Sequence, residues 1–373
     1  MKLRLNWRLV FVLVILAGFA TREVALELRP SFLRPDLHLF AYVSNSADGT
    51  LTVIDLVKLA PFATIAVGPG PSGVREHPTR KEIWGLSSAG GYAWVLDVKS
   101  NQIVAHIAVG AEPYALDFSP DGKLAFVAAS GANTVVAIDC ASRAIVARGR
   151  AGRRPWIARV TPDGKILIVS NRDDSTVSLL DANSLASLGT ISVASQPEQI
   201  AVLPDNSKAF VTSGTSNDIS VVDLRQKTLL ANVAIGGTPS DLILKPDGGE
   251  LYITASDTNG LLVLNTQTNE IGDFLMLGSS PSSGTLKADT ETLYVSDSTA
   301  GHVVPVAMAT RQVLRPITVG SEPRTSRLTP GGDILLVVDT ASDDLAVIRP
   351  KTANLITLIP VGPKPRDLAI KVF

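Results

Sequence analysis

A proline that returns every 42 residues constrains this chain more than any other feature of its sequence. The proline ends a short element, VGxxP or a close variant, that first appears as VGPGP and last appears as VGPKP. Its eight copies lie at Pro71, Pro113, Pro155, Pro197, Pro239, Pro281, Pro323 and Pro365. A constant period of this length over most of a chain is typical of proteins built from repeated supersecondary units.

Each repeat contains four short apolar segments separated by turn residues. In the copy that begins at Pro113, residues 114–118 lead into a Pro-Asp-Gly turn, which is followed by LAFVAA, by TVVAID and by AIVARGRAG. Proline fixes the backbone dihedral that opens such a turn, and glycine permits the positive dihedral that completes it. Four antiparallel strands per repeat, arranged radially, describe a propeller blade, so the sequence predicts an all-β propeller.

The number of blades follows from the strands that lie outside the complete repeats. Seven sets of four strands run from residue 72 to about residue 362, with three strands before them and one, residues 366–373, after them. The leftover strands sum to one blade, so we predict eight blades within residues 38–373. The C-terminal strand would enter the first blade and close the ring, which removes exposed sheet edges. Seven blades are the alternative, because the segment near residue 34 also resembles an innermost strand.

The segment YVSN at residues 42–45, with TLTVID and TIAVGPGP after it, resembles the repeat of the YVTN family of exported bacterial and archaeal β-propellers. Related segments recur in later repeats as FVAA, IVSN, FVTS, YITA and YVSD. The resemblance implies the propeller fold over nearly the whole chain after its first residues. It implies no single activity, because proteins that share a fold differ in function.

The N-terminal residues carry the pattern of an export signal. Basic residues precede an apolar run at residues 9–20, in which Gly18 and Ala20 are the small residues that a signal peptidase reads. The run is short for a membrane span, which needs about 20 residues. We therefore expect a signal peptide at 1–20, an extension at 21–37, and a periplasmic or extracellular protein without a transmembrane span after cleavage. A retained anchor is the alternative.

Composition and motifs narrow the classes of function. A net charge of -1 gives no general attraction to nucleic acid, so we expect no such partner. Cys140 is the only cysteine, so an internal disulfide and a C-x-x-C-H haem attachment are both excluded. The histidines lack metal-ligand spacing, and the usual nucleophile, calcium and phosphate-loop motifs are missing. We predict no catalytic residue, no metal and no cofactor, and we expect a monomer.

Several repeated residues are expected to be structural. Asn45 and Asn171 at strand ends, and an aspartate at the end of the third segment, fit turns in which the side chain accepts backbone N–H groups. Trp84 and Trp94 fall on strand positions that hold core residues elsewhere. The aspartates of this column are Asp55, Asp97, Asp139, Asp181 and Asp223.

Polar residues on the innermost strands form the first candidate site. Strand alternation turns the positions two and four residues after each repeat proline away from the apolar positions beside them. Opposite charges on consecutive blades fit either a channel lining that neutralises itself by ion pairs or a polar ligand bound on the axis. These axial residues are Arg75, Asp117, Arg159, Arg327 and Asp367, and Asp241 also falls on one of these two positions.

The stretch RAGRRPWIARV, residues 150–160, indicates a second candidate site on one loop face. Arginine suits carboxylates and phosphates, and tryptophan offers a face for stacking. The alternative is that Glu112, Asp173 and Asp174 pair with these arginines as surface salt bridges. The predicted ligand-binding residues are Arg153, Arg154, Trp156, Tyr114 and Arg172.

Together these features favour an exported, non-catalytic propeller that binds a protein partner or an acidic small molecule. Two alternatives stay open. Lactonases that hydrolyse sugar lactones are propellers with similar repeats, and a polar axial cluster could polarise a lactone carbonyl. Propellers that resemble these repeats also hold haem d1 or accompany quinone-dependent dehydrogenases. The second alternative is therefore a cofactor-binding role beside periplasmic redox enzymes.

Overall fold

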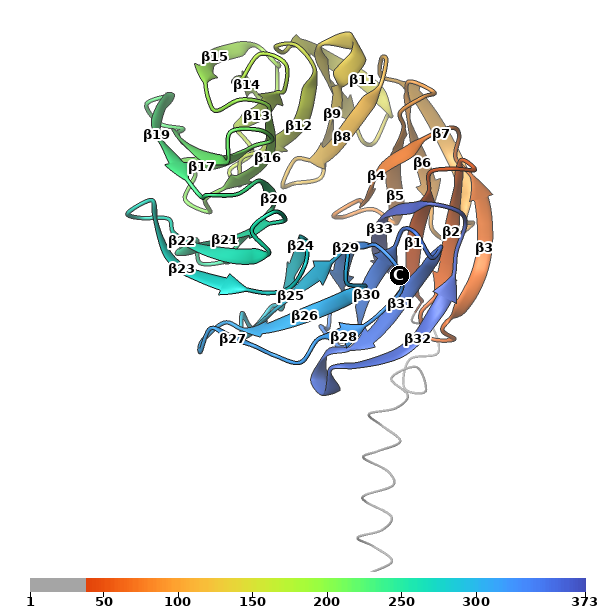
Figure 1. The fold of residues 1–373 in the computed structure, drawn as a ribbon. Helices are drawn as coiled ribbons and strands as arrows, with labels where there is room; N and C mark the ends of the chain where they lie inside the picture. The colour runs from red at the N-terminus through yellow and green to blue at the C-terminus, as the bar shows by residue number, and fades with distance from the viewer. Residues whose placement is uncertain (1–37) are drawn as a thin grey trace, which may run out of the picture.

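The chain forms a ring of eight β-sheets around a central axis (Figure 1). The structure is a computed structural model that describes residues 38–373. The prediction of eight blades is confirmed, and the seven-bladed alternative is wrong. The predicted signal peptide and the extension at 21–37 lie outside the described residues.

Each blade runs from an inner strand at the axis to an outer strand at the rim. Only blade 7 departs from four continuous strands, because its outer strand is interrupted at residues 314–316. Short 3-10 helices lie at Ser130–Ala132 and Pro350–Thr352. From inner to outer strand, the blades are as follows: blade 1, β33 (Pro365–Val372), β1 (Leu39–Asn45), β2 (Thr50–Asp55) and β3 (Ala60–Ala66); blade 2, β4 (Pro71–Glu76), β5 (Glu82–Ser87), β6 (Tyr92–Asp97) and β7 (Gln102–Ala108); blade 3, β8 (Pro113–Phe118), β9 (Leu124–Ala129), β10 (Thr134–Asp139) and β11 (Ala144–Arg150); blade 4, β12 (Pro155–Val160), β13 (Ile166–Asn171), β14 (Thr176–Asp181) and β15 (Ser187–Ser192); blade 5, β16 (Pro197–Val202), β17 (Lys208–Ser213), β18 (Asp218–Asp223) and β19 (Thr228–Ala234); blade 6, β20 (Pro239–Leu244), β21 (Glu250–Ala255), β22 (Gly260–Asn265) and β23 (Glu270–Met276); blade 7, β24 (Pro281–Leu286), β25 (Thr292–Asp297), β26 (His302–Ala307), β27 (Gln312–Val313) and β28 (Ile317–Thr318); blade 8, β29 (Pro323–Leu328), β30 (Leu335–Asp339), β31 (Asp344–Arg349) and β32 (Asn354–Pro360).

The C-terminal strand closes the ring, as predicted. β33 pairs antiparallel with β1 from Leu39 opposite Val372 to Asn45 opposite Pro365. Beyond the last paired residues, His38 and Phe373 exchange both backbone hydrogen bonds, at 3.1 and 3.0 Å. The inner strand of blade 1 therefore comes from the opposite end of the chain from its other three strands.

The hydrophobic core is divided into eight layers, one between each pair of neighbouring blades. Trp94 contributes to the layer between blades 1 and 2, and Trp84 to the layer between blades 2 and 3. Both side chains are fully buried, which confirms their predicted core position. A strand that is apolar on both faces suits this arrangement, because each blade is covered on both sides.

The repeated aspartates make the predicted turn contacts. Asp55 Oδ1, for example, accepts the backbone N–H groups of Val57 at 2.9 Å and Lys58 at 3.0 Å, and the other four accept in the same way. The same prediction is wrong for Asn45, whose amide nitrogen donates to the hydroxyls of Thr50 and Thr52, and for Asn171. Its amide nitrogen donates to the hydroxyls of Thr176 and Ser178 across a hairpin, and its oxygen accepts the Gly152 N–H from the preceding loop.

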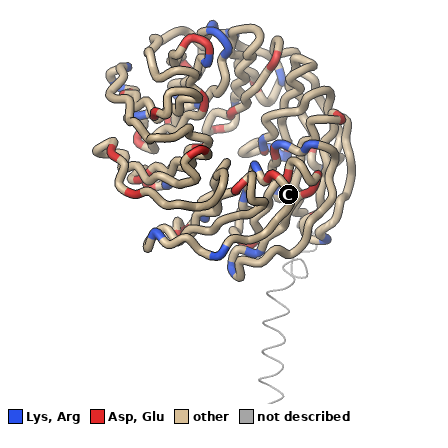
Figure 2. The backbone as a smooth tube through the Cα atoms, viewed as in Figure 1, with Lys and Arg blue, Asp and Glu red and all other residues tan. Residues whose placement is uncertain are grey.

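Charged residues are interspersed around the ring, and neither sign dominates one side of the tube in Figure 2. Within residues 38–373, no helix has the length and apolar character needed to cross a bilayer.

Candidate functional site

Two faces of the ring carry different kinds of loop. One face, called the loop face here, carries the loops that join successive blades and the loops between the second and third strands. These loops bond to each other, as in Arg172 N to Arg154 O at 3.1 Å and Asp173 N to Arg153 O at 3.3 Å. The opposite face, called the turn face here, carries the Pro-Asp-Gly turns.

A break in strand pairing follows the repeat proline in every blade, directly in seven blades and after Ser72 in blade 2. In blade 4, for example, Pro155 pairs with Asn171 but the next paired residue is Ala158. Such irregularities redirect side chains out of the regular pleat. The residue directly after the proline therefore lies at the loop-face end of the axis, in a column that consists of Arg366, Ser72, Tyr114, Trp156, Glu198, Ser240, Ser282 and Arg324.

Tyr114 and Trp156 stack on each other across blades 3 and 4. Their ring centroids are 3.5 Å apart and the ring planes differ by 24°. The Arg172 guanidinium lies over the Trp156 ring at 4.6 Å from its centroid and pairs with Glu198 of blade 5 at 2.9 Å. Both faces of the indole are thus covered by the protein's own side chains, so the expected free stacking face of Trp156 is not available.

The two arginines of the opening stretch have different surroundings. Arg153 is held by Asp174, with 2.5 Å between Arg153 Nε and Asp174 Oδ1 and 2.6 Å between its backbone nitrogen and Oδ2. The salt-bridge alternative therefore holds for Arg153, although Glu112 has no part in it. Arg154 has a left-handed backbone, with φ of +53°, and its guanidinium lies 5.9 Å from the Trp156 ring centroid. Within residues 38–373, no carboxylate forms an ion pair with Arg154.

Arg366 and Ser72 belong to the same region, and the sequence reasoning missed both. Burial raises the pKa of the Tyr114 hydroxyl, and the nearby positive charge of Arg366 opposes that rise. Ser72 lies on the blade between them, and its Oγ is buried without a hydrogen-bond partner. Their shared position after the repeat proline was the signal that could have found them. We define the loop-face cluster as Tyr114, Arg154, Trp156, Arg172 and Arg366.

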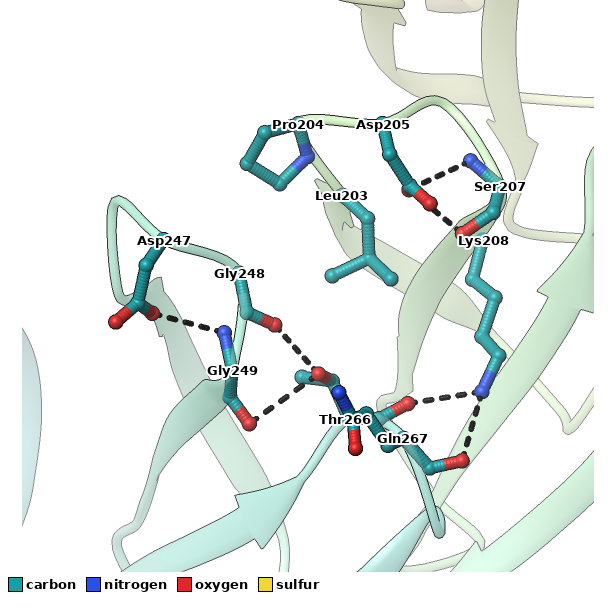
Figure 3. A pocket seen from close by; sticks show the side chains of 10 residues that line it. All are labelled: Leu203, Pro204, Asp205, Ser207, Lys208, Asp247, Gly248, Gly249, Thr266 and Gln267. Atoms are coloured by element: carbon teal, nitrogen blue, oxygen red, sulfur yellow. Dashed lines mark hydrogen bonds between the residues drawn. The ribbon is translucent and has the colours of Figure 1, made fainter.

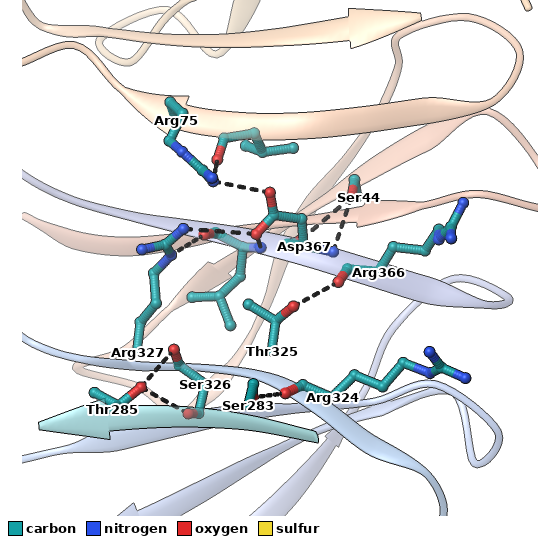
Figure 4. A network of polar contacts seen from close by, with 12 residues as sticks. Ser44, Arg75, Ser283, Thr285, Arg324, Thr325, Ser326, Arg327, Arg366 and Asp367 are labelled. Carbon is teal, nitrogen blue, oxygen red and sulfur yellow. Dashed lines mark hydrogen bonds and ion pairs between the residues drawn. The ribbon is translucent and has the colours of Figure 1, made fainter. Parts of the chain in front are cut away.

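The predicted axial residues come together as neighbouring ion pairs (Figure 4). Asp367 contacts Arg75 at 2.9 Å and Arg327 at 3.7 Å, so it bridges blades 2 and 8. Asp117 contacts Arg159 at 3.4 Å. Burial alone would lower the pKa of Arg75, but the nearby carboxylates of Asp367 and Asp117 outweigh burial and raise it. In Figure 4 the Arg324 and Arg366 side chains extend together, away from Arg75 and Arg327.

Asp241 is the one axial carboxylate without an arginine contact. Its oxygens accept backbone N–H groups instead, from Leu242 at 2.9 Å and from Gly284 of the next blade at 3.1 Å. Burial raises its pKa to about 6. The Gly284 N–H lies at the edge of an inner strand and has no neighbouring strand to bond to. The Asp241 side chain therefore supplies the acceptor that this backbone donor would otherwise lack.

A pocket of about 290 Å³ lies between blades 5 and 6 on the turn face (Figure 3). Its polar groups bond to one another. Lys208 Nζ donates to Thr266 O at 2.8 Å and to Asn269 Oδ1 at 2.9 Å, and Asp247 accepts the Gly249 N–H. This pocket therefore offers few unused donors to a ligand. Among the described residues, no group of three or more His, Cys, Asp or Glu side chains is placed to hold a metal ion.

Comparison with known proteins agrees with this architecture. Residues 123–301 match the family model described as YNCE-like beta-propeller. No curated protein matches the chain in sequence. Similar solved structures include the dihydro-heme d1 dehydrogenase NirN in complex with DHE, with 16% identity and a TM-score of 0.72 over 88% of this chain and 74% of that one.

Two further structures are similar in fold. AztD from Citrobacter koseri, in its apo form, has 11% identity and a TM-score of 0.71 over 90% of this chain and 98% of that one. Kuenenia stuttgartiensis hydrazine synthase has 17% identity and a TM-score of 0.63 over 75% and 96%. At these identities the likeness extends to the fold alone. The family match, the 42-residue repeat and the closed ring of eight blades together identify the chain as an eight-bladed β-propeller and are consistent with a YVTN-type propeller family.

Proposed function

We propose that the chain is an exported, non-catalytic binding protein whose loop face docks an acidic segment of a partner protein. The observation that carries the proposal is the loop-face cluster, in which Arg154 and Arg366 are exposed and have no carboxylate partner among residues 38–373. Arginine, tryptophan and tyrosine are the residue types that dominate binding energy at protein interfaces. The planar guanidinium groups of Arg154 and Arg366 suit paired hydrogen bonds to carboxylates.

The breadth of the cluster favours a protein segment over a small molecule. Its residues come from blades 1, 3 and 4 and from the loop between the last two, so the cluster extends from Arg366 of blade 1 to Arg172 of blade 4. The stacked pair of Tyr114 and Trp156 is already rigid, so little side-chain entropy would be lost when a partner docks against it.

A cofactor-binding role is the second candidate, because NirN was solved in complex with DHE and has the same fold. The histidines give it little support. His77 uses Nδ1 to accept the N–H groups of Thr79 and Arg80, and His38 stacks on Phe373. None of the four histidines belongs to the loop-face cluster or to the axial residues. A new visible absorption band when the purified protein is titrated with haem would favour this candidate.

The proposal is tested with a fluorescein-labelled peptide of eight glutamates, whose binding is followed by fluorescence anisotropy at low salt. We expect the double variant Arg154→Gln with Arg366→Ser to bind at least about tenfold more weakly, because each arginine can donate charge-assisted hydrogen bonds. Glutamine fits because Gln196 has φ of +51° at the equivalent position of blade 5. Serine fits because it occupies the Arg366 position in three other blades.

Lys165→Gln is the matched control, since it removes one exposed positive charge from the turn face. It should leave the affinity within about twofold. Equal affinity of the double variant and the unmodified protein would overturn the proposal. Binding of free glutamate as tightly as the peptide would show that a small molecule is the ligand.

A further inference from the structure

A cavity of about 410 Å³ lies at the turn-face end of the axis, among the inner strands of blades 3 to 6. Its volume falls in the range of small-molecule sites, which are mostly apolar with a few polar groups. Ile200, Val202, Leu242 and Leu244 form one side, and Asp117 and Arg159 form the other.

The apolar side exists because the column of charged axial residues is interrupted. Four residues after the repeat proline, blades 2, 3, 4 and 8 carry Arg75, Asp117, Arg159 and Arg327. Blades 5 and 6 carry Ala201 and Ile243 at that position instead. The small Ala201 side chain lines the cavity, so part of its space lies where another blade has a long charged side chain.

Arg159 has hydrogen-bonding capacity left over. One Arg159 nitrogen contacts Asp117 Oδ1 at 3.4 Å, a distance beyond the usual range for such a bond. Asp117 Oδ2 accepts the Val160 N–H at 3.1 Å, so this carboxylate is held mainly by a backbone donor rather than by Arg159. A guanidinium carries five N–H donors, and no other acceptor within residues 38–373 contacts those of Arg159.

The other axial arginines, Arg75 and Arg327, make shorter hydrogen bonds than Arg159 does. Arg75 donates to Asp367 and to its own strand's Val74 carbonyl, both at 2.9 Å. Arg327 donates to Leu368 O at 2.7 Å. The Arg159 side chain is 35% exposed and lines the cavity, so its unused donors are accessible from the turn face.

We propose that this cavity binds a small monocarboxylate with an apolar chain, whose carboxylate pairs with Arg159 and whose chain packs against Ile200, Val202, Leu242 and Leu244. Thr161, the other polar side chain of the wall, does not compete for the ligand. Its hydroxyl donates to Asp163 at 2.7 Å and accepts the Ile166 N–H at 3.0 Å. The site lies on the face opposite the loop-face cluster, so it does not depend on the proposed partner binding.

The test is isothermal titration of the purified protein with hexanoate, with its isosteric neutral amide hexanamide, and with propionate. We expect hexanoate to bind at one site, and both other compounds to bind at least about tenfold more weakly. Hexanamide lacks the charge that Arg159 recognises, and propionate lacks most of the chain that the apolar side covers. No binding of hexanoate, or equal binding of hexanamide, would overturn the proposal.

Two variants locate the site, each checked for an unchanged circular dichroism spectrum. Arg159→Gln should weaken hexanoate binding at least about tenfold, while the matched variant Arg327→Gln removes an axial arginine outside the cavity and should change it less than twofold. Ala201→Phe leaves Arg159 in place but fills the cavity, and it should abolish binding. Unchanged affinity in Ala201→Phe, or an equal loss in both arginine variants, would contradict the assignment.

Discussion

Blade 1 and blade 4 have the same strand order, but the chain builds them differently. Blade 4 is continuous from Pro155 to Ser192, whereas blade 1 combines residues 39–66 with 365–372. The two blades also share a buried asparagine at the same repeat position. Asn45 and Asn171 each donate two hydrogen bonds of 2.9 Å to hydroxyls of the next strand. The local sequence thus specifies the blade in both cases, and only blade 1 adds a contact between the two ends of the chain.

The inner strands of the two blades differ in what they contribute. In blade 1, Asp367 joins the arginines of both neighbouring blades, so the closing strand is held by charge as well as by backbone pairing. In blade 4, Trp156 and Arg154 contribute to an exposed cluster on the loop face. One repeated unit has therefore been adapted for closure at one place and for an exposed surface at another.

Deletion of residues 366–373 should have the largest effect, because it removes the closing strand from blade 1. Leu368 and Ala369 are fully buried and Ile370 is 7% exposed, so the deletion opens a cavity in the core on both sides of the blade. Loss of one buried Leu or Ile alone costs about 2–5 kcal/mol, so we expect the free energy of unfolding to fall by more than about 5 kcal/mol.

Urea unfolding followed by circular dichroism measures this loss. Leu368→Ala gives a graded comparison, with an expected loss of about 2–5 kcal/mol. A truncated protein with the same unfolding midpoint as the full chain would show that blade 1 does not need its fourth strand.

Blade 8 departs from blades 1 and 4 at the buried asparagine, and this gives the second prediction. Asp339 occupies that position, and Asp344 replaces the threonine that faces it. Burial and a hydrogen bond to Asp344 raise the pKa of Asp339 to about 8. The folded state keeps a proton that the unfolded chain releases above about pH 4, so the pair's contribution to stability is full below pH 4 and is lost as the pH rises toward 8.

Asp339→Asn should remove this pH dependence, because an amide donates a hydrogen bond without a titrating proton. We expect the variant to match the unmodified protein near pH 4 and to be more stable by about 1–3 kcal/mol at pH 9. Asp333→Asn, which removes an exposed carboxyl from the same blade, is the control. A constant difference between Asp339→Asn and the unmodified protein from pH 4 to 9 would show that the pair does not share a proton.

The sequence predicted the architecture well because the repeat itself carries the information. The interval between Pro71 and Pro365 gave the number of blades, and the leftover strands gave the closure. The site was predicted only in part. Arg366 lies in the cluster with Tyr114 although they are far apart in sequence, and the pairing break after each proline, which redirects these side chains, has no residue signature of its own.

The smallest effect is expected from giving blade 4 the loop sequence of blade 5, by the double substitution Arg153→Ser and Arg154→Gln. The ion pair of Arg153 with Asp174 is exposed and screened by solvent, and in the described part of the chain Arg154 has no acidic partner to lose. Gln196 already adopts the left-handed backbone that position 154 requires, so the loop itself should not be strained. The melting temperature should therefore change by less than about 2 °C. Arg154→Val is the contrasting variant, because a β-branched residue tolerates positive φ poorly and should lower the melting temperature clearly. If the blade 5 sequence destabilises the protein as much as valine does, the arginines contribute to the fold of blade 4, and the distinction between a closing blade and a blade adapted for binding fails.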